Sequence, residues 1–287
     1  MTDAVKEPGS LAKTPLFEAQ HADRYARQEL IRTYEQLTGA QLIVLIDQIF
    51  ARGLTVLQEL LIGLDRSREL HVLLATPGGD GEVAVRMIRA MQARCTRLVI
   101  IVPDMAKSAG TLMCLGADVI RMAPFSDLGP VDPQFQVGNS LAGAKEIVAA
   151  VATAEDRVAQ QPNSYPLYSA LLADVTMLMV EQAKAAITRT EALIDEALQC
   201  RTEPPDDTER GRLVQQLRRP LIDDPTDHAA TVGPKLAERI GLPVEVADLD
   251  SESWTIIWQL WTRYFALGCY PAGARAIYEG RLASHMR

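Results

Sequence analysis

The sequence contains few of the residues from which disulfide scaffolds and zinc sites are built. It has four cysteines and four histidines in 287 residues, and no two cysteines form a Cys-x-x-Cys pair. Scattered thiols of this kind make no disulfide framework and are typical of a reducing compartment. The histidines lack the ligand spacing of a zinc site. The sequence therefore predicts a cytoplasmic protein without a metal centre.

Basic residues are in the minority, and no long uninterrupted apolar run is present. The 29 Lys and Arg residues against 37 Asp and Glu residues give a net charge of −8. Nucleic-acid binding needs a dense basic face, which this composition does not favour. The longest apolar stretch, 41–64, is interrupted by Asp47, Gln48, Arg52 and Glu59, and the N-terminus lacks the pattern of a signal peptide. We expect no nucleic-acid partner and no membrane span.

The first half of the chain shows an alternation of strand and helix patterns. Hydrophobic residues make up 48% and charged residues 23% of the chain, as in ordinary globular proteins. Short apolar runs rich in β-branched residues alternate with helical patterns; the runs are 41–46, 69–75, 97–103 and 118–124, and the helical segments are 54–64, 81–93 and 108–117. This order predicts an α/β fold whose parallel sheet is covered by helices on both faces.

The second half is dominated by helical patterns. They cover 144–154 and 167–199, and the Pro-rich acidic segment 201–209 follows as a linker. A last helix is predicted over 252–267, where Trp254, Trp258, Trp261 and Phe265 share one face. We expect this aromatic face to pack within the protomer or against a neighbour.

Two glycine-rich turns carry the chemistry. ATPGGDG (75–81) follows the second predicted strand, and PDMAKSAGT (103–111) follows the third, with Ser108 at the start of a helix. Because neighbouring parallel strands end at the same edge of a sheet, the two turns are expected to meet there. Ser108 has two interpretations: an ordinary helix N-cap, or a nucleophile whose oxyanion is received by neighbouring backbone N–H groups.

The segments TPGGDGEVAVRMIRAM and MAKSAGTLMCLGADVIRMAPFSDLGPVDPQ resemble the Clp protease/crotonase superfamily. In order and spacing they are most similar to its signal peptide peptidase A-like branch, the serine dehydrogenase proteinases. With looser matches at 24–39 and 228–245, the resemblance covers about residues 24–245. It implies a spiral of ββα units, with Ser108 as the nucleophile of a serine peptidase and the N–H groups of Gly79 and Ala109 as oxyanion donors.

The rest of the chain is assigned from its residue patterns. Pro and Gly residues near the N-terminus predict a flexible leader at 1–21, and helical pattern predicts a helical C-terminal appendage at 250–287, on either side of the Clp/crotonase-like peptidase domain that the resemblance implies at 22–249. The name serine dehydrogenase further implies a pyridoxal phosphate lysine, for which the sequence has no motif, so we expect no cofactor.

The general base is where this sequence departs from the Clp pattern. LGPVDPQ has no histidine where that branch carries one, which argues against a Ser–His–Asp triad. The peptidase A branch implies a Ser–Lys dyad, and Lys184, 76 residues after Ser108, resembles the dyad lysine of archaeal stomatin-partner proteases. Lys145 and His228 are alternatives; a solvated helix position for either lysine and a surface turn for the histidine remain open. Lys107 is discounted, because adjacent residues on a turn point apart.

The sequence thus predicts a serine peptidase that cleaves peptides or unfolded protein segments by acyl-enzyme chemistry. Two alternatives stay open: a crotonase-class acyl-CoA enzyme that uses the two N–H donors to hold a thioester enolate, and a catalytically inactive assembly scaffold of the same fold. Helices projecting beyond the sheet and an aromatic stripe leave apolar surface too large for a monomer, so we expect a closed, symmetric homo-oligomer.

Overall fold

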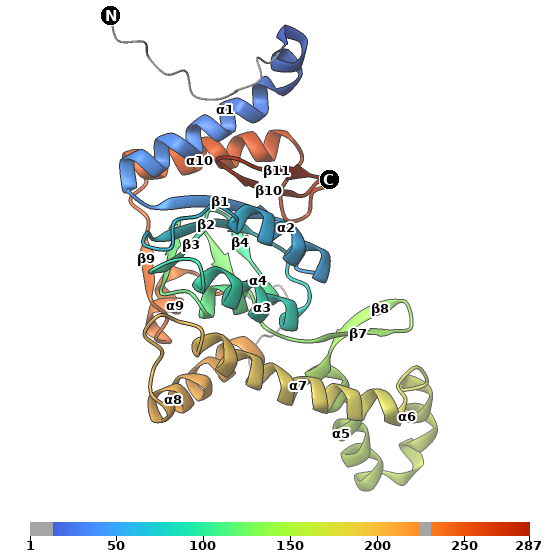
Figure 1. Cartoon of the computed structure of the whole chain (residues 1–287). Helices are drawn as coiled ribbons and strands as arrows, with labels where there is room; N and C mark the ends of the chain where they lie inside the picture. Colours follow the sequence, from blue (N-terminus) through green and yellow to red (C-terminus); the bar gives the residue numbers. More distant parts are fainter. Residues whose placement is uncertain (1–13, 224–230) are drawn as a thin grey trace, which may run out of the picture.

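The computed structural model (Figure 1) describes residues 14–223 and 231–287. Most of the leader expected at 1–21 lies outside the described residues. Its last part is helical, because α1 (Pro15–Thr38) begins after Thr14, whose side chain accepts a hydrogen bond from the Phe17 N–H.

A seven-stranded sheet with the order β11-β10-β1-β2-β3-β5-β9 forms the centre of the fold. Its parallel strands are β1 (Gln41–Ile46), β2 (Leu70–Ala75), β3 (Leu98–Val102), β5 (Val119–Met122) and β9 (Val244–Val246). Every residue of β1, β2 and β3 is buried, as expected for parallel strands covered on both faces. The four predicted strands are all present, and the predicted α/β class is confirmed.

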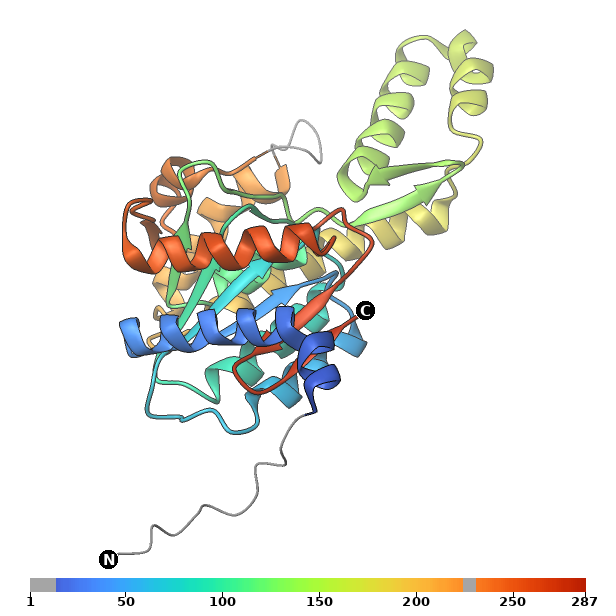
Figure 2. The ribbon, with the colours of Figure 1, turned by 90° about the horizontal axis from the view of Figure 1, so that it is seen from above.

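Two helical layers cover the sheet. On one face lie α2 (Ala51–Leu61), α3 (Gly81–Gln92), α4 (Ala109–Leu115), α8 (Asp207–Arg218), the π-helical η2 (Arg219–Asp223) and α9 (Pro234–Arg239). On the other face α1 packs beside α10 (Glu252–Ala266), as Figures 1 and 2 show. Each layer has its own apolar core, so the sheet is rigidly held from both sides.

The structure corrects the helical appendage expected at 250–287. After α10 the chain forms β10 (Ile277–Gly280) and β11 (Ser284–Met286), and β10 pairs antiparallel with β1. A buried ion pair between Arg27 Nε and Glu279 Oε2 (2.7 Å) ties α1 to β10, and Tyr264 of α10 donates to the same carboxylate oxygen at 2.8 Å. The C-terminal segment is therefore part of the central sheet.

The aromatic face of α10 is divided between core and solvent. Trp254 and Trp261 are buried, whereas Trp258 and Phe265 are 41% and 57% exposed. Trp258 lies edge-on to Phe125, with ring centroids 5.8 Å apart. Half of the aromatic face, Trp254 and Trp261, thus packs within the protomer, and the other half stays at the surface.

A helical arm projects from the body of the molecule (Figures 1 and 2). We define the arm as residues 134–187: the hairpin β7 (Gln134–Val137) and β8 (Ser140–Gly143), α5 (Ala144–Gln160), the short 3-10 helix η1 (Pro162–Ser164), α6 (Tyr165–Leu171) and the first half of α7 (Met177–Leu198). The helix expected over 167–199 is broken in two. Thr176 caps α7 by accepting a hydrogen bond from the Met179 N–H (3.1 Å), so a new helix begins there.

His71 makes the stability of this fold sensitive to acid. The ring is buried in β2, with Nδ1 2.7 Å from the Tyr34 hydroxyl and Nε2 3.3 Å from a Glu69 carboxylate oxygen. Burial lowers the pKa of His71 from 6.5 to about 4. Between these two pH values the unfolded chain binds a proton at this histidine and the folded chain does not. The stability that this difference contributes is therefore fully present above pH 6.5 and is lost as the pH falls to 4.

We expect this histidine to account for about 3 kcal/mol of the free energy of unfolding lost between pH 7 and pH 4. Urea unfolding of the wild type and His71→Asn at both pH values measures the difference. His285→Asn, at an exposed position, is the control and should lose as much stability as the wild type. A His71→Asn variant with the full wild-type loss would contradict the assignment.

Candidate active site

The two glycine-rich turns meet at the carboxyl edge of the sheet, as their spacing predicts. The Thr76 N–H donates to the Met105 carbonyl (3.1 Å), and the Lys107 N–H donates to the Thr76 carbonyl (3.0 Å). These bonds continue the pairing of β2 and β3 beyond their ends, through β4 (Met105–Ala106), which itself pairs with β6 (Asp127–Leu128). The turns are thereby fixed against each other by the backbone.

The first turn needs glycine at two positions. Gly78 and Gly79 have φ values of 112° and 145°, which residues with side chains rarely adopt. The turn is pinned to Ile49, whose N–H donates to the Gly78 carbonyl (2.9 Å) and whose carbonyl accepts from the Asp80 N–H (2.7 Å). A Cβ on Gly79 would overlap the Ile49 carbonyl, and one on Gly78 would lie 2.7 Å from the Ser108 Cβ. Gly78 therefore lies directly against the candidate nucleophile.

Ser108 is strained, and its side chain does not cap the helix. Its φ of 49° and ψ of −113° make it the one non-glycine residue with positive φ in the part of the chain that the structure describes. Although Ser108 stands at the N-cap of α4, its hydroxyl makes no capping hydrogen bond. A strained backbone of this kind costs about 1–3 kcal/mol and is characteristic of functional positions. The geometry does not support the interpretation of Ser108 as an ordinary N-cap.

Two backbone N–H groups belong to residues directly beside the contact between Gly78 and Ser108. Ala109 follows Ser108 at the first position of α4, and Gly79 follows Gly78. Neither N–H donates a hydrogen bond to another backbone group or side chain within 14–223 and 231–287. The structure thus brings Ser108, Gly79 and Ala109 together and leaves both donors open.

Thr111 stabilises the serine turn through hydrogen bonds of its hydroxyl, a role that the sequence did not predict. Its fully buried hydroxyl lies 2.9 Å from the Ala106 carbonyl oxygen and 2.8 Å from the Gly129 carbonyl oxygen, which share its one proton as acceptors, and it accepts from the Gly129 N–H (3.2 Å). Thr111 therefore links the serine turn to the segment after β6. A threonine three residues after a serine in the first turn of a helix is the only sequence signal for it.

Lys107 is engaged away from the serine. Its ammonium lies 2.6 Å from Asp127 Oδ1, and its side chain packs on Gly129. Burial and the neighbouring carboxylate of Asp127 raise the pKa of Asp104 in the same cluster. These contacts agree with discounting Lys107 as a base.

The three candidate bases have different surroundings. Lys184 lies on α7, where its ammonium contacts Glu181 Oε1 at 2.9 Å and its side chain is 52% exposed. The burial against Ser108 expected for a base is not present in this single chain. Lys145 is half-buried at the start of α5, and His228 lies outside the described residues.

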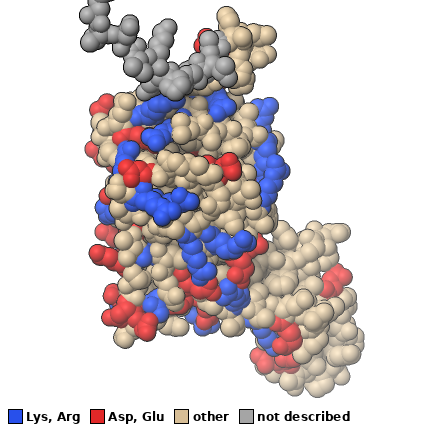
Figure 3. Space-filling view, in the orientation of Figure 1, with Lys and Arg blue, Asp and Glu red and all other residues tan. Residues whose placement is uncertain are grey.

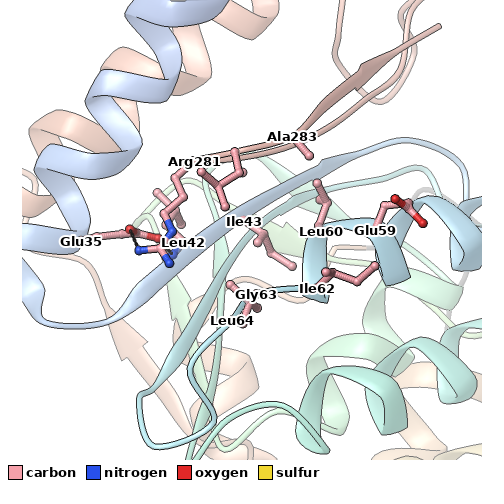
Figure 4. Close-up of a pocket in the computed structure, with 12 residues that line it drawn as sticks. Glu35, Leu42, Ile43, Glu59, Leu60, Ile62, Gly63, Leu64, Arg281 and Ala283 are labelled. Carbon is pink, nitrogen blue, oxygen red and sulfur yellow. Dashed lines mark hydrogen bonds and ion pairs between the residues drawn. The ribbon is translucent and has the colours of Figure 1, made fainter. Parts of the chain in front are cut away.

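A recess at the opposite end of β1 is too small to bind a substrate (Figure 4). It lies between α2 and the β10–β11 turn, where Arg281 contacts Glu35 at 3.6 Å, and its volume is only about 20 Å³. The Glu35 carboxylate is also used to accept a hydrogen bond from the Leu42 N–H (3.0 Å). Such a space holds at most a water molecule, so it offers no substrate site.

Neither a metal-binding cluster nor a membrane-spanning helix occurs in the described part of the chain. No group of three His, Cys, Asp or Glu side chains there could hold a metal ion. No helix within those residues has the length and apolar character needed to cross a membrane.

Comparison with known proteins places the chain in a family. A sequence model of the ClpP-like SDH-type serine proteinases matches residues 64–245, more than half of the chain. Two relatives are uncharacterized proteins of Methanocaldococcus jannaschii. MJ0137 is 27% identical over 192 residues, covering 67% of this chain and 58% of the relative, and MJ1495 is 28% identical over 129 residues, covering 45% and 38%. The chain thus spans less than two thirds of the length of either relative.

Among solved structures, two variants of the 1510-N membrane-bound stomatin-specific protease are similar. A lysine-to-alanine variant in complex with a substrate peptide has 18% identity and a TM-score of 0.43, covering 74% of this chain and 78% of that one. A serine-to-alanine variant has 17% identity and a TM-score of 0.44, covering 77% and 81%. These similarities are too low to locate residues of the site.

Proposed function

The chain belongs to the ClpP-like SDH-type serine proteinase family, and we propose that it cleaves peptides or unfolded protein segments with Ser108 as the nucleophile. The observation that carries the proposal is the strained, uncapped Ser108 beside two open backbone donors. A hydroxyl held in this way is free to attack, and fixed N–H groups need no rearrangement to receive negative charge.

The reaction follows from these groups. The Ser108 Oγ attacks the peptide carbonyl while its proton passes to a base, and the N–H groups of Gly79 and Ala109 bind the resulting oxyanion. The base then returns the proton to the leaving amine as the C–N bond breaks. Water, deprotonated by the same base, attacks the acyl-enzyme and releases the new carboxylate and Ser108.

For the base we propose Lys184, which would form a Ser–Lys dyad with Ser108. A lysine takes a proton only when it is neutral and within reach of the serine, whereas the Lys184 ammonium lies in an exposed contact with Glu181 (2.9 Å). The proposed role therefore requires this exposed contact to break and the ammonium to lose water, which costs less for an exposed pair than for a buried one.

A fluorophosphonate reagent tests the nucleophile directly. We expect the reagent to phosphonylate the wild-type protein once, on the peptide that contains Ser108. An acyl-CoA enzyme that used only the two N–H donors would not react, nor would an inactive scaffold. Absence of labelling under conditions that label a known serine peptidase would overturn the proposal.

We also propose that the enzyme works in the cytoplasm, where its four free cysteines would stay reduced. The peptidase unit would comprise residues 22–249 together with the C-terminal strands, because β10 pairs with β1.

A homo-oligomer assembled through the arm is part of the proposal. The arm carries several large apolar side chains that are 59–71% exposed: Leu141, Tyr165, Leu167, Leu171, Met177 and Leu178. In Figure 3 the arm, at the lower right, presents mostly uncharged residues. Exposed apolar patches of this kind mark association sites, and a second copy of the chain is the partner we propose.

We therefore expect a mass well above the 31.5 kDa of one chain in light scattering at micromolar concentration. Leu171→Asp combined with Met177→Asp should shift the protein toward the monomer, because charges would then be buried without partners. Leu282→Asp, at an equally exposed leucine on the β10–β11 turn, is the matched control. A wild-type protein that scatters as a monomer would contradict the proposed assembly.

A further inference from the structure

A recess of about 420 Å³ lies beside the candidate active site, at the carboxyl end of β1. It is lined by Asp47 and Gln48, directly after β1, by Arg52 of α2, and by the loop before β10. The next residue, Ile49, holds the Gly78–Gly79 turn through two hydrogen bonds. Ile49 pairs with Gly79 across a parallel bridge, which sets their backbones about 5 Å apart. The recess is therefore connected to the proposed oxyanion donor through the short segment from Asp47 to Ile49.

The charges that line this recess are mainly positive. Arg52, Arg275 and Arg287 face a single carboxylate side chain, that of Asp47. Arg287 contacts Asp47, whose side chain is almost fully buried. Within the described residues, Arg52 and Arg275 form no ion pair, and the first turn of α2 contains no acidic residue. The Arg275 guanidinium does donate a long hydrogen bond to the Leu267 carbonyl (3.5 Å). Two guanidinium groups without a carboxylate partner among the described residues thus line this recess, in a protein whose net charge is −8.

The backbone of the loop that carries Arg275 is held in place by its own hydrogen bonds. The Gly273 N–H donates to the Tyr270 carbonyl (2.7 Å), and the Arg275 N–H donates to the Gly268 carbonyl (3.2 Å). Gly268 has a φ of 81°, which allows the sharp turn out of α10. A site whose backbone is already fixed loses little entropy on binding.

We propose that this recess binds a carboxylate of the peptide substrate, so that the enzyme prefers acidic peptides. The proposal rests on the proposed function and adds a substrate class to it. A guanidinium presents parallel N–H donors that match a carboxylate, which makes arginine suited to this task. The carboxylate could belong to an acidic side chain or to the free C-terminus of the peptide, and the experiment distinguishes these sources.

Binding is measured without turnover, by fluorescence anisotropy in the full-length Ser108→Ala protein. Three labelled peptides differ only in their carboxylates: one has an internal glutamate and an amidated end, one has glutamine and a free C-terminus, and one has glutamine and an amidated end. We expect the peptide with the preferred carboxylate to bind at least about tenfold more tightly than the neutral peptide, equivalent to about 1.4 kcal/mol. Added salt should reduce this preference, because it screens the charges.

In the Ser108→Ala background, Arg52→Gln with Arg275→Gln should remove the preference and leave the affinity for the neutral peptide within about twofold. Arg66→Gln, an exposed arginine at the amino end of β2, is the control for net charge and should keep the preference. Equal binding of all three peptides, or a preference that survives the double substitution, would overturn the inference. Failure of the fluorophosphonate to label Ser108 in the wild type would instead overturn the proposed function, whatever the peptides show.

Discussion

Replacing Ser108 with alanine is expected to abolish peptide hydrolysis and fluorophosphonate labelling while leaving the melting temperature almost unchanged. The hydroxyl makes no hydrogen bond with the described residues, so its removal leaves no buried group unsatisfied. Loss of a serine nucleophile lowers kcat by about 10⁴-fold or more in serine peptidases. The two effects together would show that the residue serves chemistry and not folding.

Ser108→Gly sharpens this test because it acts on the backbone. At φ 49° and ψ −113° a serine is strained by about 1–3 kcal/mol, whereas glycine adopts this conformation freely at an entropic cost of about 0.5–1 kcal/mol. We expect the glycine variant to be inactive yet about 1 kcal/mol more stable, which raises the melting temperature by about 2–4 °C.

Scanning calorimetry and labelling of the same samples measure both quantities. Ser140→Ala, at an exposed position of the β7–β8 hairpin, is the control and should change neither. An active Ser108→Gly protein, or one that is strongly destabilised, would contradict the view that strain is held at Ser108 for function.

The centre of the fold could be predicted from the sequence because local signals agree there. The strand at 41–46 is predicted with the limits that the structure has, since five of its six residues are apolar and the run is bounded by Gly39 two residues before it and by Asp47 directly after it. The meeting of the two glycine-rich turns follows from the rule that parallel strands end at one edge. The glycines at 78 and 79 mark a turn in the sequence because glycine tolerates positive φ, and the fold requires positive φ at both positions.

The parts that were missed depend on distant partners. The segment 277–280 is a strand because β1 offers it an edge and Arg27 offers Glu279 a charge partner; four residues ending in glycine give no such signal alone. The break between α6 and α7 depends on the hydroxyl of Thr176, within a run whose pattern continues as a helix. The recess at Arg52 and Arg275 joins residues more than 200 positions apart, which no local pattern links.

The second large effect concerns the base. We expect Lys184→Ala to abolish fluorophosphonate labelling and to lower kcat/KM more than tenfold. An ordinary lysine has a pKa of about 10.4, so only about one molecule in a thousand is neutral at pH 7.5. We expect a lysine that acts as the base to be neutral in about a quarter of the molecules. Lowering the pKa of a lysine that far costs about 3 kcal/mol, because the charged form must be destabilised by that amount. In the structure the Lys184 ammonium is held in an exposed contact with Glu181, and Glu181→Gln, which removes that ion pair and frees the side chain to move, should raise activity at neutral pH.

Lys145→Ala and His228→Ala are tested beside Lys184→Ala and Glu181→Gln, so that each candidate base is removed in turn. Each protein is tested for labelling and for its pH–rate profile. If Lys184→Ala keeps more than about a tenth of the wild-type kcat/KM, a loss below about 1.4 kcal/mol, then it is not the base. A histidine base would give a rate that rises through about pH 6 to 7 without an alkaline requirement. Loss of labelling in Lys145→Ala would place the base at the start of α5, where the β7–β8 hairpin of the arm leads into that helix, instead of on α7.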